Sequence, residues 1–375
     1  MNDTTRRDFL AATGLGLMIV KPESVRGSQA NSALTVGLIG CGRRGTAISG
    51  IFVKNEFCRM AAICDIYDDQ IAEASKQFSG AKVFKNYHDL LASDVDAVYI
   101  ATPPFLHPEC FEAAVKVRKH IFMEKPAGVD AAGCRRVIAA AKQADKTKRI
   151  TVDFQQRYGK DYRKAHEIVT SGQLGGIKQI RASWFGGPTP IRSGHPASEE
   201  KMRNWLFYRE YSGDILIEQD CHNIDVVNWF MGTHPLKAFG YGGRQVRTDI
   251  GNVMDNLTAT FKFANGVVVG YDANQMSFGN YADVSETFIC EKGTVNVSRK
   301  GYKLYNNKDR KAPPQEVTTS YDITEDAVNE FIDGARNGRL ENAAFTAAES
   351  TLTAIMAREA IYKEREMTFD VIAKS

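Results

Sequence analysis

The sequence predicts an α/β fold in two parts, a doubly wound parallel sheet followed by an α+β domain with an open, mainly antiparallel sheet. Short apolar runs alternate with helical patterns up to residue 154, whereas long β-prone runs separated by turn dipeptides prevail after Tyr158. The 375-residue chain is also longer than a single hydrophobic core usually accommodates. We therefore predict two domains, 31–156 and 157–375, after an N-terminal segment, 1–30.

The first part alternates between short strands and helices. Buried, β-prone runs predict strands at residues 34–39, 59–64, 83–84, 97–101, 120–123 and 150–154. Helical patterns between them predict helices at residues 69–78, 87–91, 108–118 and 131–142. Strands separated by helices in this way pair in parallel, which predicts the doubly wound sheet.

The turn after the first strand has the composition of a phosphate-binding loop. Gly40, Gly42 and Gly45 have G-x-G-x-x-G spacing between the strand and a helix. Gly40 would permit a tight turn, Gly42 the close approach of a pyrophosphate, and Gly45 the packing of the helix on the strand. The phosphates would lie at the N–H groups of the helix N-terminus. A glycine turn without a ligand is the weaker alternative.

Asp65 ends the second predicted strand, about 20 positions after the glycines, where dinucleotide-binding folds carry an acidic residue. Its carboxylate can accept hydrogen bonds from both ribose hydroxyls and would repel a 2′-phosphate. Ile66 and Tyr67, which follow it, offer no cation. The sequence therefore predicts NAD as the cofactor and disfavours NADP.

Residues 1–30 indicate an export signal rather than part of the fold. The pair Arg6-Arg7 lies in a twin-arginine pattern, and a weakly apolar run follows at residues 11–20. That run is shorter than the about 20 apolar residues that span a bilayer. Cleavage near residues 28–30 would leave the mature protein in the periplasm. A cytoplasmic enzyme with an N-terminal tail is the alternative.

Composition argues against several other classes. The seven cysteines form no C-x-x-C pair and no zinc spacing, so we expect most of them to be small buried hydrophobic residues. A net charge of +3 on 375 residues gives no basis for a nucleic-acid surface. After the signal, no apolar run is long enough for a membrane span.

The second part begins with a helix at 161–170 and a β-prone run at 177–185. An irregular stretch follows at 186–214, and then a helix at 217–231. Further β-prone runs lie at residues 236–246, 257–263, 267–275, 286–291 and 294–297. Asn265-Gly266 and Lys292-Gly293 are hairpin signals between neighbouring runs. Two amphipathic helices, 325–337 and 343–363, are expected to pack back across both domains.

Six segments carry a resemblance that covers nearly all of the predicted mature chain. They are VGLIGCGRRG (36–45), AVYIATPPFLH (97–107), MEKPAG (123–128), DFQQRY (153–158), IEQDCHNID (217–225) and STLTAIMAREA (350–360). In these segments the chain resembles the glucose-fructose oxidoreductase, inositol dehydrogenase and MocA family of sugar dehydrogenases. The resemblance implies a Rossmann domain and a carbohydrate or cyclitol substrate. It also implies the cofactor-binding residues Gly40, Gly42, Arg43, Arg44, Gly45, Asp65, Thr102, Pro103, His107, Glu124 and Lys125.

The resemblance places Glu124 and Lys125 beside the nicotinamide, with Lys125 touching the substrate hydroxyl. A lysine near the partial positive charge of oxidised nicotinamide is expected to have a lowered pKa, and it could polarise the hydroxyl or accept its proton. Composition alone would instead favour a surface Glu-Lys pair.

His222 is implied as the general acid/base, because hydride removal requires the hydroxyl proton to be taken up at the same time. On the predicted helix 217–231, Glu218, His222 and Asp225 have i, i+4 and i+7 spacing and can share one face. Many dehydrogenases of the family have Asp where this chain has Glu218, which leaves the proton relay open. A metal site formed by these three side chains is a weaker alternative, and we predict none.

The irregular stretch is expected to shape the substrate site, because aromatic faces and polar groups together suit sugar rings. The expected substrate residues are Arg157, Tyr158, Arg203, Trp205, Tyr208 and His222, with His195, Asn204 and Arg209 as further candidates.

Two functions remain open. In the first, the protein oxidises a sugar or cyclitol hydroxyl with NAD, while Lys125, His222 and Glu218 handle the alcohol proton. In the second, it is an NAD-dependent glycoside hydrolase or lyase that works through a transient 3-keto sugar and recycles tightly bound NAD, as an exported enzyme without a pool of free NAD would need. A non-catalytic sugar-binding protein is less favoured, since Lys125 and His222 are present. We expect a homo-oligomer, a dimer or a tetramer.

Overall fold

A computed structural model describes residues 33–306, 309 and 311–375, so the predicted export signal lies outside the described residues. Residues Leu34–Ser375 form one compact unit. Within the described residues, no helix has the length and apolar character needed to cross a bilayer.

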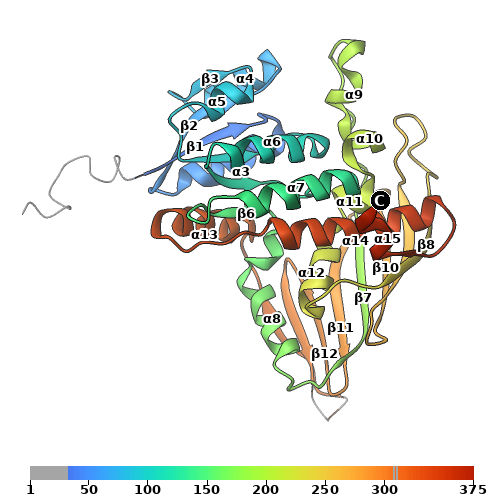
Figure 1. Cartoon of the computed structure of the whole chain (residues 1–375). Coiled ribbons are helices and arrows are strands. Elements are labelled where there is room, and N and C mark those ends of the chain that lie inside the picture. Colours follow the sequence, from blue (N-terminus) through green and yellow to red (C-terminus); the bar gives the residue numbers. More distant parts are fainter. Residues whose placement is uncertain (1–32, 307–308, 310) are drawn as a thin grey trace, which may run out of the picture. The chain divides into compact units, whose positions relative to one another are not determined.

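The first sheet has six parallel strands in the order β3-β2-β1-β4-β5-β6 (Figure 1). The strands are β1 Leu34–Ile39, β2 Cys58–Cys64, β3 Lys82–Phe84, β4 Ala97–Ile100, β5 His120–Met123 and β6 Ile150–Val152. The connecting helices are α3 Arg43–Lys54, α4 Asp68–Gln77, α5 Tyr87–Leu91, α6 His107–Lys116 and α7 Ala131–Gln143. The strand order reverses at β1, and open α/β sheets bind ligands beyond the carboxyl ends of the strands at such a point.

Apolar side chains bury both faces of this sheet, as a parallel sheet requires. Val36 belongs to a core cluster with Phe52 of α3 and Phe331 of α13 (Thr324–Asn337). Ile100 and Phe111 belong to a second cluster, which extends through α6 and α7 into the second part of the chain. The predicted doubly wound sheet is confirmed.

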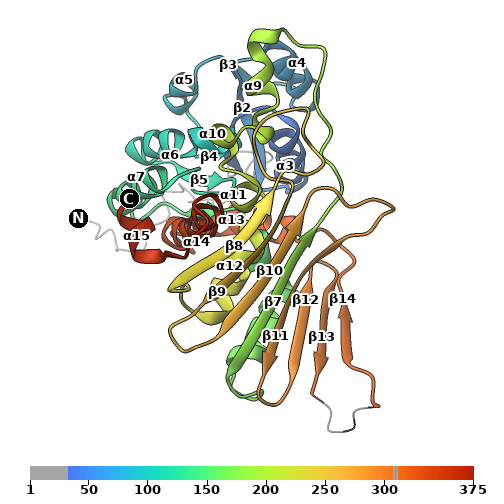
Figure 2. The same cartoon turned by 90° about the vertical axis from the view of Figure 1, so that its right-hand side faces the viewer.

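The second sheet has nine strands in the order β14-β13-β12-β11-β7-β10-β9-β8-β15 (Figure 2). Its strands are β7 Ile177–Phe185, β8 Lys237–Gly243, β9 Asn256–Lys262, β10 Val268–Asn274, β11 Asp283–Cys290, β12 Thr294–Ser298, β13 Gly301–Tyr305, β14 Gln315–Thr318 and β15 Met367–Thr368. β7 and β10 pair in parallel, and the other neighbours pair antiparallel. The predicted, mainly antiparallel sheet is confirmed, although the sequence pattern predicted neither β13, β14, β15 nor the short helix α15 (Phe369–Lys374).

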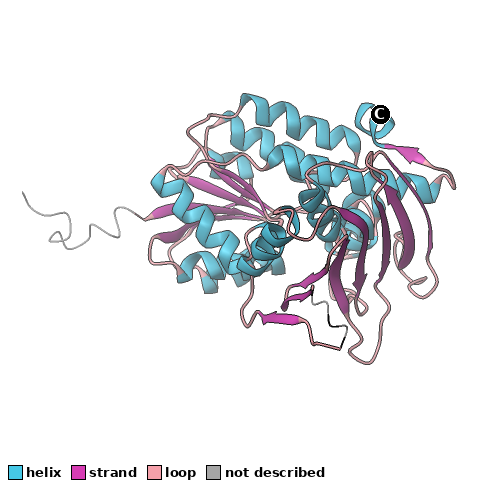
Figure 3. Ribbon diagram, turned by 90° about the horizontal axis from the view of Figure 1, so that it is seen from below, coloured by secondary structure: helices cyan, strands magenta, loops and turns pink. Residues whose placement is uncertain are grey.

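Helices gather against one face of the second sheet (Figure 3). α8 (Lys160–Thr170) contacts β12 and β13, and α12 (Cys221–Met231) contacts β7 and β11. α13 packs on α3 and β1, whereas α14 (Ala344–Tyr362) contacts both α7 and β8. α13 thus packs on the first part of the chain, and α14 contacts both parts.

α14 differs from the predicted amphipathic helix, because buried residues occupy all of its sides. Even Thr351, Thr353 and Arg358 are buried. A helix that lies between two packed layers has no solvent face to reserve for polar residues, so its sequence loses the amphipathic period.

The predicted helix 217–231 is wrong as a single element. The chain forms α11 (Ile215–Glu218) and α12, with a break at Gln219 and Asp220. In a continuous helix the carbonyl of Glu218 would accept a hydrogen bond from the N–H of His222. That N–H instead donates to the carbonyl of Gln219 at 3.4 Å, and the Glu218 carbonyl accepts from the ammonium of Lys125. A contact from the first sheet thus replaces a helical hydrogen bond.

A buried carboxyl group lies between the second sheet and its helices. Glu286 of β11 is fully buried and accepts hydrogen bonds from Tyr162 at 3.2 Å and from Asn223 at 2.7 Å. Burial raises the pKa of Glu286 to about 8, and the two hydrogen bonds only partly oppose that rise.

The free energy of unfolding should therefore fall as pH rises from about 4.3, the pKa of an unfolded glutamate, to about 8. In this window the unfolded state loses a proton that folded Glu286 keeps, and the stabilisation is fully present only below the unfolded pKa. Glu286→Gln removes this titration, so its melting temperature should change less between pH 5 and pH 9 than that of the wild type. Calorimetry measures how the melting temperature of the wild type and of Glu286→Gln changes with pH. Glu316→Gln, a substitution at an exposed position, is the control. Equal slopes for wild type and Glu286→Gln would contradict the prediction.

Candidate active site

The turn between β1 and α3 is shaped by its glycines. Gly40 has φ +98°, and a Cβ on it would lie 2.6 Å from the carbonyl oxygen of Ala101. A Cβ on Gly45 would lie 2.0 Å from the carbonyl oxygen of Gly40, whereas a Cβ on Gly42 would have nothing within 4 Å. Gly42 caps α3 without a side-chain hydrogen bond, which leaves the first N–H groups of the helix as donors. The turn thus has the room and the donors that a pyrophosphate needs.

Asp65 follows β2 at the same edge of the sheet. Its carboxylate accepts hydrogen bonds from the backbone N–H groups of Cys41, at 2.7 Å, and Tyr67, at 3.0 Å. Burial raises the pKa of Asp65, and these hydrogen bonds oppose the rise. Each carboxylate oxygen has a second lone pair, so the group can also accept ribose hydroxyls. The glycine turn and Asp65 therefore fit a dinucleotide.

Arg203 connects the second part of the chain to the segment that follows Asp65. It stands at the end of α9 (Glu200–Arg203) and donates to the two carboxylate oxygens of Asp69 at 2.7 and 2.8 Å. Its guanidinium carbon lies 3.6 Å from the centre of the Tyr67 ring. The structure thus places Arg203, a predicted substrate residue, beside the segment that follows Asp65.

Three carboxylates and their cations lie farther along the same carboxyl edge of the parallel sheet, where Glu124 follows β5 and Asp153 follows β6. Glu124 accepts hydrogen bonds from the hydroxyl of Tyr99 at 2.7 Å and from Arg44 at 3.0 Å, and Arg44 also donates to Asp153 at 2.6 Å. Burial, followed by the nearby charge of Glu124, raises the pKa of Asp153 to about 7, although Arg44 opposes the rise. Arg44 is therefore committed to two carboxylates.

Lys125 contacts the third carboxylate. Its ammonium donates to the main-chain carbonyl of Glu218 and, at 3.0 Å, to the Glu218 side chain. Burial alone would lower the pKa of Lys125, but the carboxylate of Glu218 outweighs it and the pKa is raised. The predicted lowered pKa is therefore wrong for the protein alone, because the sequence pattern did not show that Glu218 would be the lysine's partner.

His107 supports the turn after β5. Its two ring nitrogens lie 2.6 Å from the carbonyl oxygen of Pro126 and 2.9 Å from that of Thr102. The imidazole thereby ties the Lys125-Pro126 turn to the loop after β4.

His222 stands in the first turn of α12 and lies between aromatic rings. It stacks on Trp184, with ring centres 5.7 Å apart, and meets the edge of Phe154 at 5.9 Å. Burial, and then the charges of Lys125, Arg299 and Arg44, lower the pKa of His222 well below its usual value. Its Nδ1 has no hydrogen-bond partner among the described residues. Burial and the nearby cations thus favour the neutral form of the ring in the protein alone.

Asp225 does not join Glu218 and His222. It is fully buried and accepts two hydrogen bonds from Arg157, at 2.7 and 2.9 Å, and one from Ser350 at 2.7 Å. The break between α11 and α12 separates Glu218 from His222, and the contacts with Arg157 and Ser350 occupy Asp225. No group of metal-ligating side chains that could hold an ion occurs within the described part of the chain.

A cavity of about 600 Å³ unites these groups. The predicted residues that line it are Gly42, Arg43, Arg44, Thr102, His107, Glu124, Lys125, Arg203, Asn204, Trp205, Glu218 and His222. Gln155, Trp184, Gln219 and Arg299 also line it and were not predicted. Gln155 and Gln219 stand within the quoted motifs but were not named as site residues. Trp184 and Arg299 lie outside every segment that the sequence pattern singled out.

Other predicted residues lie outside the cavity lining. Gly40, Asp65 and Pro103 belong to the surrounding loops, and Gly45 lies in the first turn of α3. Arg157 is bound to Asp225, and the buried Tyr158 donates to Glu341 at 3.1 Å, so neither reaches a substrate there. The remaining three belong to the irregular stretch and contact other side chains: Tyr208 lies beside Lys201, Arg209 over Tyr362, and the largely buried His195 against Glu200.

Gln219 is oriented by a chain of buried polar groups. Arg247 donates to the side-chain oxygen of Gln275 at 2.7 Å, and the Gln275 amide nitrogen donates to the side-chain oxygen of Gln219 at 2.6 Å. A guanidinium can only donate, so it determines which way both amides face. The NH₂ group of Gln219 is therefore left as a donor at the cavity.

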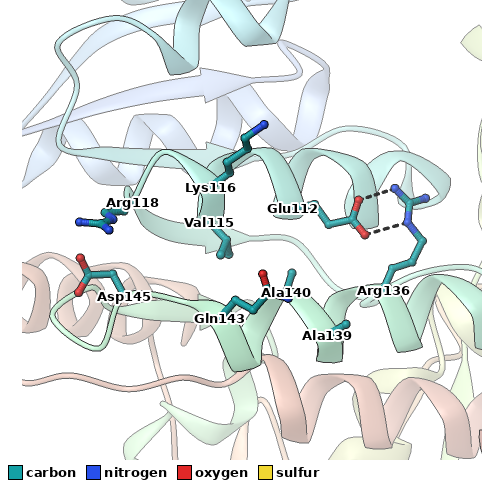
Figure 4. Close-up of a pocket in the computed structure, with 9 residues that line it drawn as sticks. All are labelled: Glu112, Val115, Lys116, Arg118, Arg136, Ala139, Ala140, Gln143 and Asp145. Atoms are coloured by element: carbon teal, nitrogen blue, oxygen red, sulfur yellow. Dashed lines mark hydrogen bonds and ion pairs between the residues drawn. The ribbon is translucent and has the colours of Figure 1, made fainter.

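A second hollow lies between α6 and α7, has a volume of about 780 Å³ and is lined by none of the predicted residues (Figure 4). Glu112 and Arg136 at its rim bind each other at 2.6 and 2.9 Å. These two charges are thus already paired, and the hollow lies away from the carboxyl ends of the strands.

The chain is similar to known dehydrogenases. A model of the oxidoreductase family with an NAD-binding Rossmann fold matches residues 34–154, and a GFO/IDH/MocA C-terminal domain model matches residues 162–296. Myo-inositol 2-dehydrogenase of Thermotoga maritima is 26% identical over 281 residues, 72% of this chain and 79% of that relative. Inositol 2-dehydrogenase of Acidothermus cellulolyticus is 24% identical over 344 residues, 88% of this chain and 93% of that relative.

Solved structures share the fold. A levoglucosan dehydrogenase in complex with NADH has a TM-score of 0.78 and 20% identity, and the match covers 90% of this chain and 99% of that one. An apo scyllo-inositol dehydrogenase from Lactobacillus casei has a TM-score of 0.72 at 21% identity, over 90% and 99% of the two chains. With both family models in chain order and this arrangement of two sheets, the chain belongs to the GFO/IDH/MocA family of oxidoreductases, and its first part is an NAD-binding Rossmann fold.

Proposed function

We propose that the protein oxidises a hydroxyl group of a sugar or cyclitol with NAD. The observation that carries the proposal is that Lys125, from the loop after β5, and His222, from α12, line one cavity that also reaches Gly42 at the N-terminus of α3. The relatives named as inositol dehydrogenases support this class of substrate.

The two side chains suit different parts of the proton transfer. NAD, when bound, supplies the hydride acceptor. His222 is neutral and can accept the hydroxyl proton, while the ammonium of Lys125 can donate a hydrogen bond to the same oxygen as its negative charge develops. Glu218 keeps the lysine charged and positioned at 3.0 Å. Glu124 and Arg44 would border the nicotinamide, and Gly42, Arg43 and Asp65 would hold the rest of the dinucleotide.

A hydrolase or lyase is the second candidate. In it, transient oxidation at C3 acidifies the neighbouring C–H group, and the glycosidic substituent is eliminated before water adds. The contacts of Arg203 with Asp69 and Tyr67 favour it, because a bridge beside the adenosine site would slow dinucleotide release and allow the cofactor to be recycled. The proposed export through Arg6 and Arg7 would require such retention. Incubation of glycosides without added NAD separates the candidates, since only the hydrolase or lyase would release the aglycone over many turnovers.

Asp65→Ala should reduce the preference for NAD over NADP, because the carboxylate that repels a 2′-phosphate is gone. Dissociation constants of both dinucleotides, measured by fluorescence titration, test this. Asp94→Ala, an exposed position next to the start of β4, is the matched control. Equal affinity of the wild type for NAD and NADP would refute the assignment of Asp65.

His222→Ala and Lys125→Ala should each lower kcat by on the order of a hundredfold, the typical contribution of a positioned acid or base. NAD affinity should change little in both variants. His166→Ala serves as control, because this ring stacks on Trp229 and is not part of the cavity lining. Full activity of the His222 variant would move the base to another group, with Glu218 as the next candidate.

Arg203→Ala should accelerate dinucleotide dissociation by about tenfold, since the paired charge-assisted hydrogen bonds to Asp69 are lost. The decay of bound NADH fluorescence after mixing with excess NAD reports the rate directly. Lys201→Ala removes an exposed ion pair with Glu210, 3.1 Å long, from the same helix and should leave the rate unchanged. Identical release from wild type and Arg203→Ala would remove the structural support for a retained cofactor.

A further inference from the structure

One cation of the cavity has no partner that explains its position. Arg299 follows β12, lines the same cavity as His222, and is partly buried. Its guanidinium carbon lies 5.6 Å from the centre of the Trp184 ring, which in turn stacks on His222. Its Nε is buried and has no hydrogen-bond partner among the described residues. The guanidinium is therefore held beside the proposed acid/base with unused donors.

The neighbouring cations of the cavity differ from Arg299. Arg44 is bound by Glu124 and Asp153, Lys125 by Glu218, and Arg203 by Asp69 and Glu199. Arg43 and Arg192 are exposed to water. Charged groups that are partly buried are normally paired, because loss of hydration is unfavourable without a counter-charge. Arg299 lacks such a pair within the described residues.

Three carboxyl groups face Arg299 at longer range, and each is committed elsewhere. Asp153 accepts from Arg44 at 2.6 Å. Glu286 accepts from Tyr162 and Asn223, at 3.2 and 2.7 Å. Asp322 accepts from the backbone and the hydroxyl of Thr324, at 2.9 and 2.7 Å. None of the three forms an ion pair with Arg299, so its donors remain available to a ligand.

The charge around the reacting position favours an anionic ligand. The cations around this position are Arg44, Lys125 and Arg299, and the carboxyl groups are Glu124, Glu218 and Asp153. Glu124 and Asp153 bind Arg44, and Glu218 binds Lys125, so none of these carboxylates is left to pair with Arg299. Oxidised nicotinamide would add further positive charge. A substrate with a negative group would restore the balance, whereas the phosphates of the dinucleotide belong at the N-terminus of α3, on the other sheet.

We propose that Arg299 binds an anionic oxygen group of the substrate, so that the protein acts on acidic sugars, those that carry a carboxylate or a sulfate ester. The inference rests on the proposed function, since it assumes that a sugar occupies the cavity beside His222. The planar guanidinium presents paired N–H groups that match two oxygens of such an anion. Trp184 supports the guanidinium from one side and offers an aromatic surface next to the sugar.

Matched pairs of sugars test the proposal. Glucose and glucuronate, galactose and galacturonate, and galactose and its 6-sulfate differ only at C6, and the last two pairs distinguish a carboxylate from a sulfate. For the wild type we expect kcat/KM for at least one acidic member to exceed that of its neutral partner by about tenfold or more, as one charge-assisted hydrogen-bond pair provides. Calorimetric dissociation constants of the same sugars with the NADH-loaded protein give a readout independent of turnover.

Arg299→Gln should abolish the difference between the members of a pair, through a higher KM for the acidic sugar. Because the charge of Arg299 also lowers the pKa of His222, the neutral sugar serves as the reference within each variant. Arg299→Lys keeps the charge and should retain part of the preference, and Lys300→Gln, the exposed neighbour, should have none of these effects. Normal NADH binding verifies that each variant is folded. If no acidic sugar binds more tightly than its neutral partner, or if Arg299→Gln leaves the preference intact, the proposal is overturned. Oxidation of neutral sugars alone would leave the proposed function standing, whereas oxidation of neither class would overturn both.

Discussion

Lys125 and Glu218 meet where the two sheets join, and the rest of the site depends on this contact. The lysine follows β5, and its ammonium donates to both the side chain and the main-chain carbonyl of Glu218 at the end of α11. The two side chains are largely shielded, with 10% and 19% of their surface exposed. Removal of either partner would leave a buried charge without its counter-charge, which is strongly destabilising. The pair therefore keeps the lysine charged and fixes α11 against the first sheet.

The same contact determines where the histidine stands. Because the Glu218 carbonyl is turned towards Lys125, the helix ends there and restarts at Cys221. His222 then lies in the first turn of a new helix, with its ring against Trp184 rather than against Glu218. Burial and the nearby cations keep that ring neutral. A cation that can stabilise an oxyanion and a base that can accept its proton thus face one cavity without neutralising each other.

Local signals explain which parts were predictable from the sequence. The run 34–39 predicts a strand with the bounds of β1, and the run 120–123 does so for β5, because a buried parallel strand is a short apolar segment between turns. The glycine turn is likewise defined by adjacent residues. The helix 217–231 was predicted wrongly, since its periodicity is helical but a partner 93 positions away breaks it.

The charged contacts of the site were also hard to predict, because their partners are distant in the sequence. A lowered pKa for Lys125 follows from its nearness to oxidised nicotinamide, but the carboxylate that raises it comes from the other sheet. Arg203 has the composition of a sugar-binding residue, yet its contacts are with Asp69 and Tyr67. Arg299 lies after a strand in a segment with no motif, and only the pairing of β12 with β11, and of β11 with β7, brings it near Trp184. Such long-range contacts leave no trace in local composition.

The residues around the cavity consequently differ in how well they would tolerate substitution. The first sheet is constrained by the glycine turn and by the bonds among Arg44, Glu124 and Asp153, each of which has a buried partner that would be left unpaired. On the second sheet, Gln219 is also constrained, because its orientation depends on Gln275 and Arg247. Arg299 is bound to none of these networks. A substitution there would break no hydrogen bond or ion pair among the described residues, so this strand end is where a change of side chain would perturb the fold least, although it would also act on the pKa of His222.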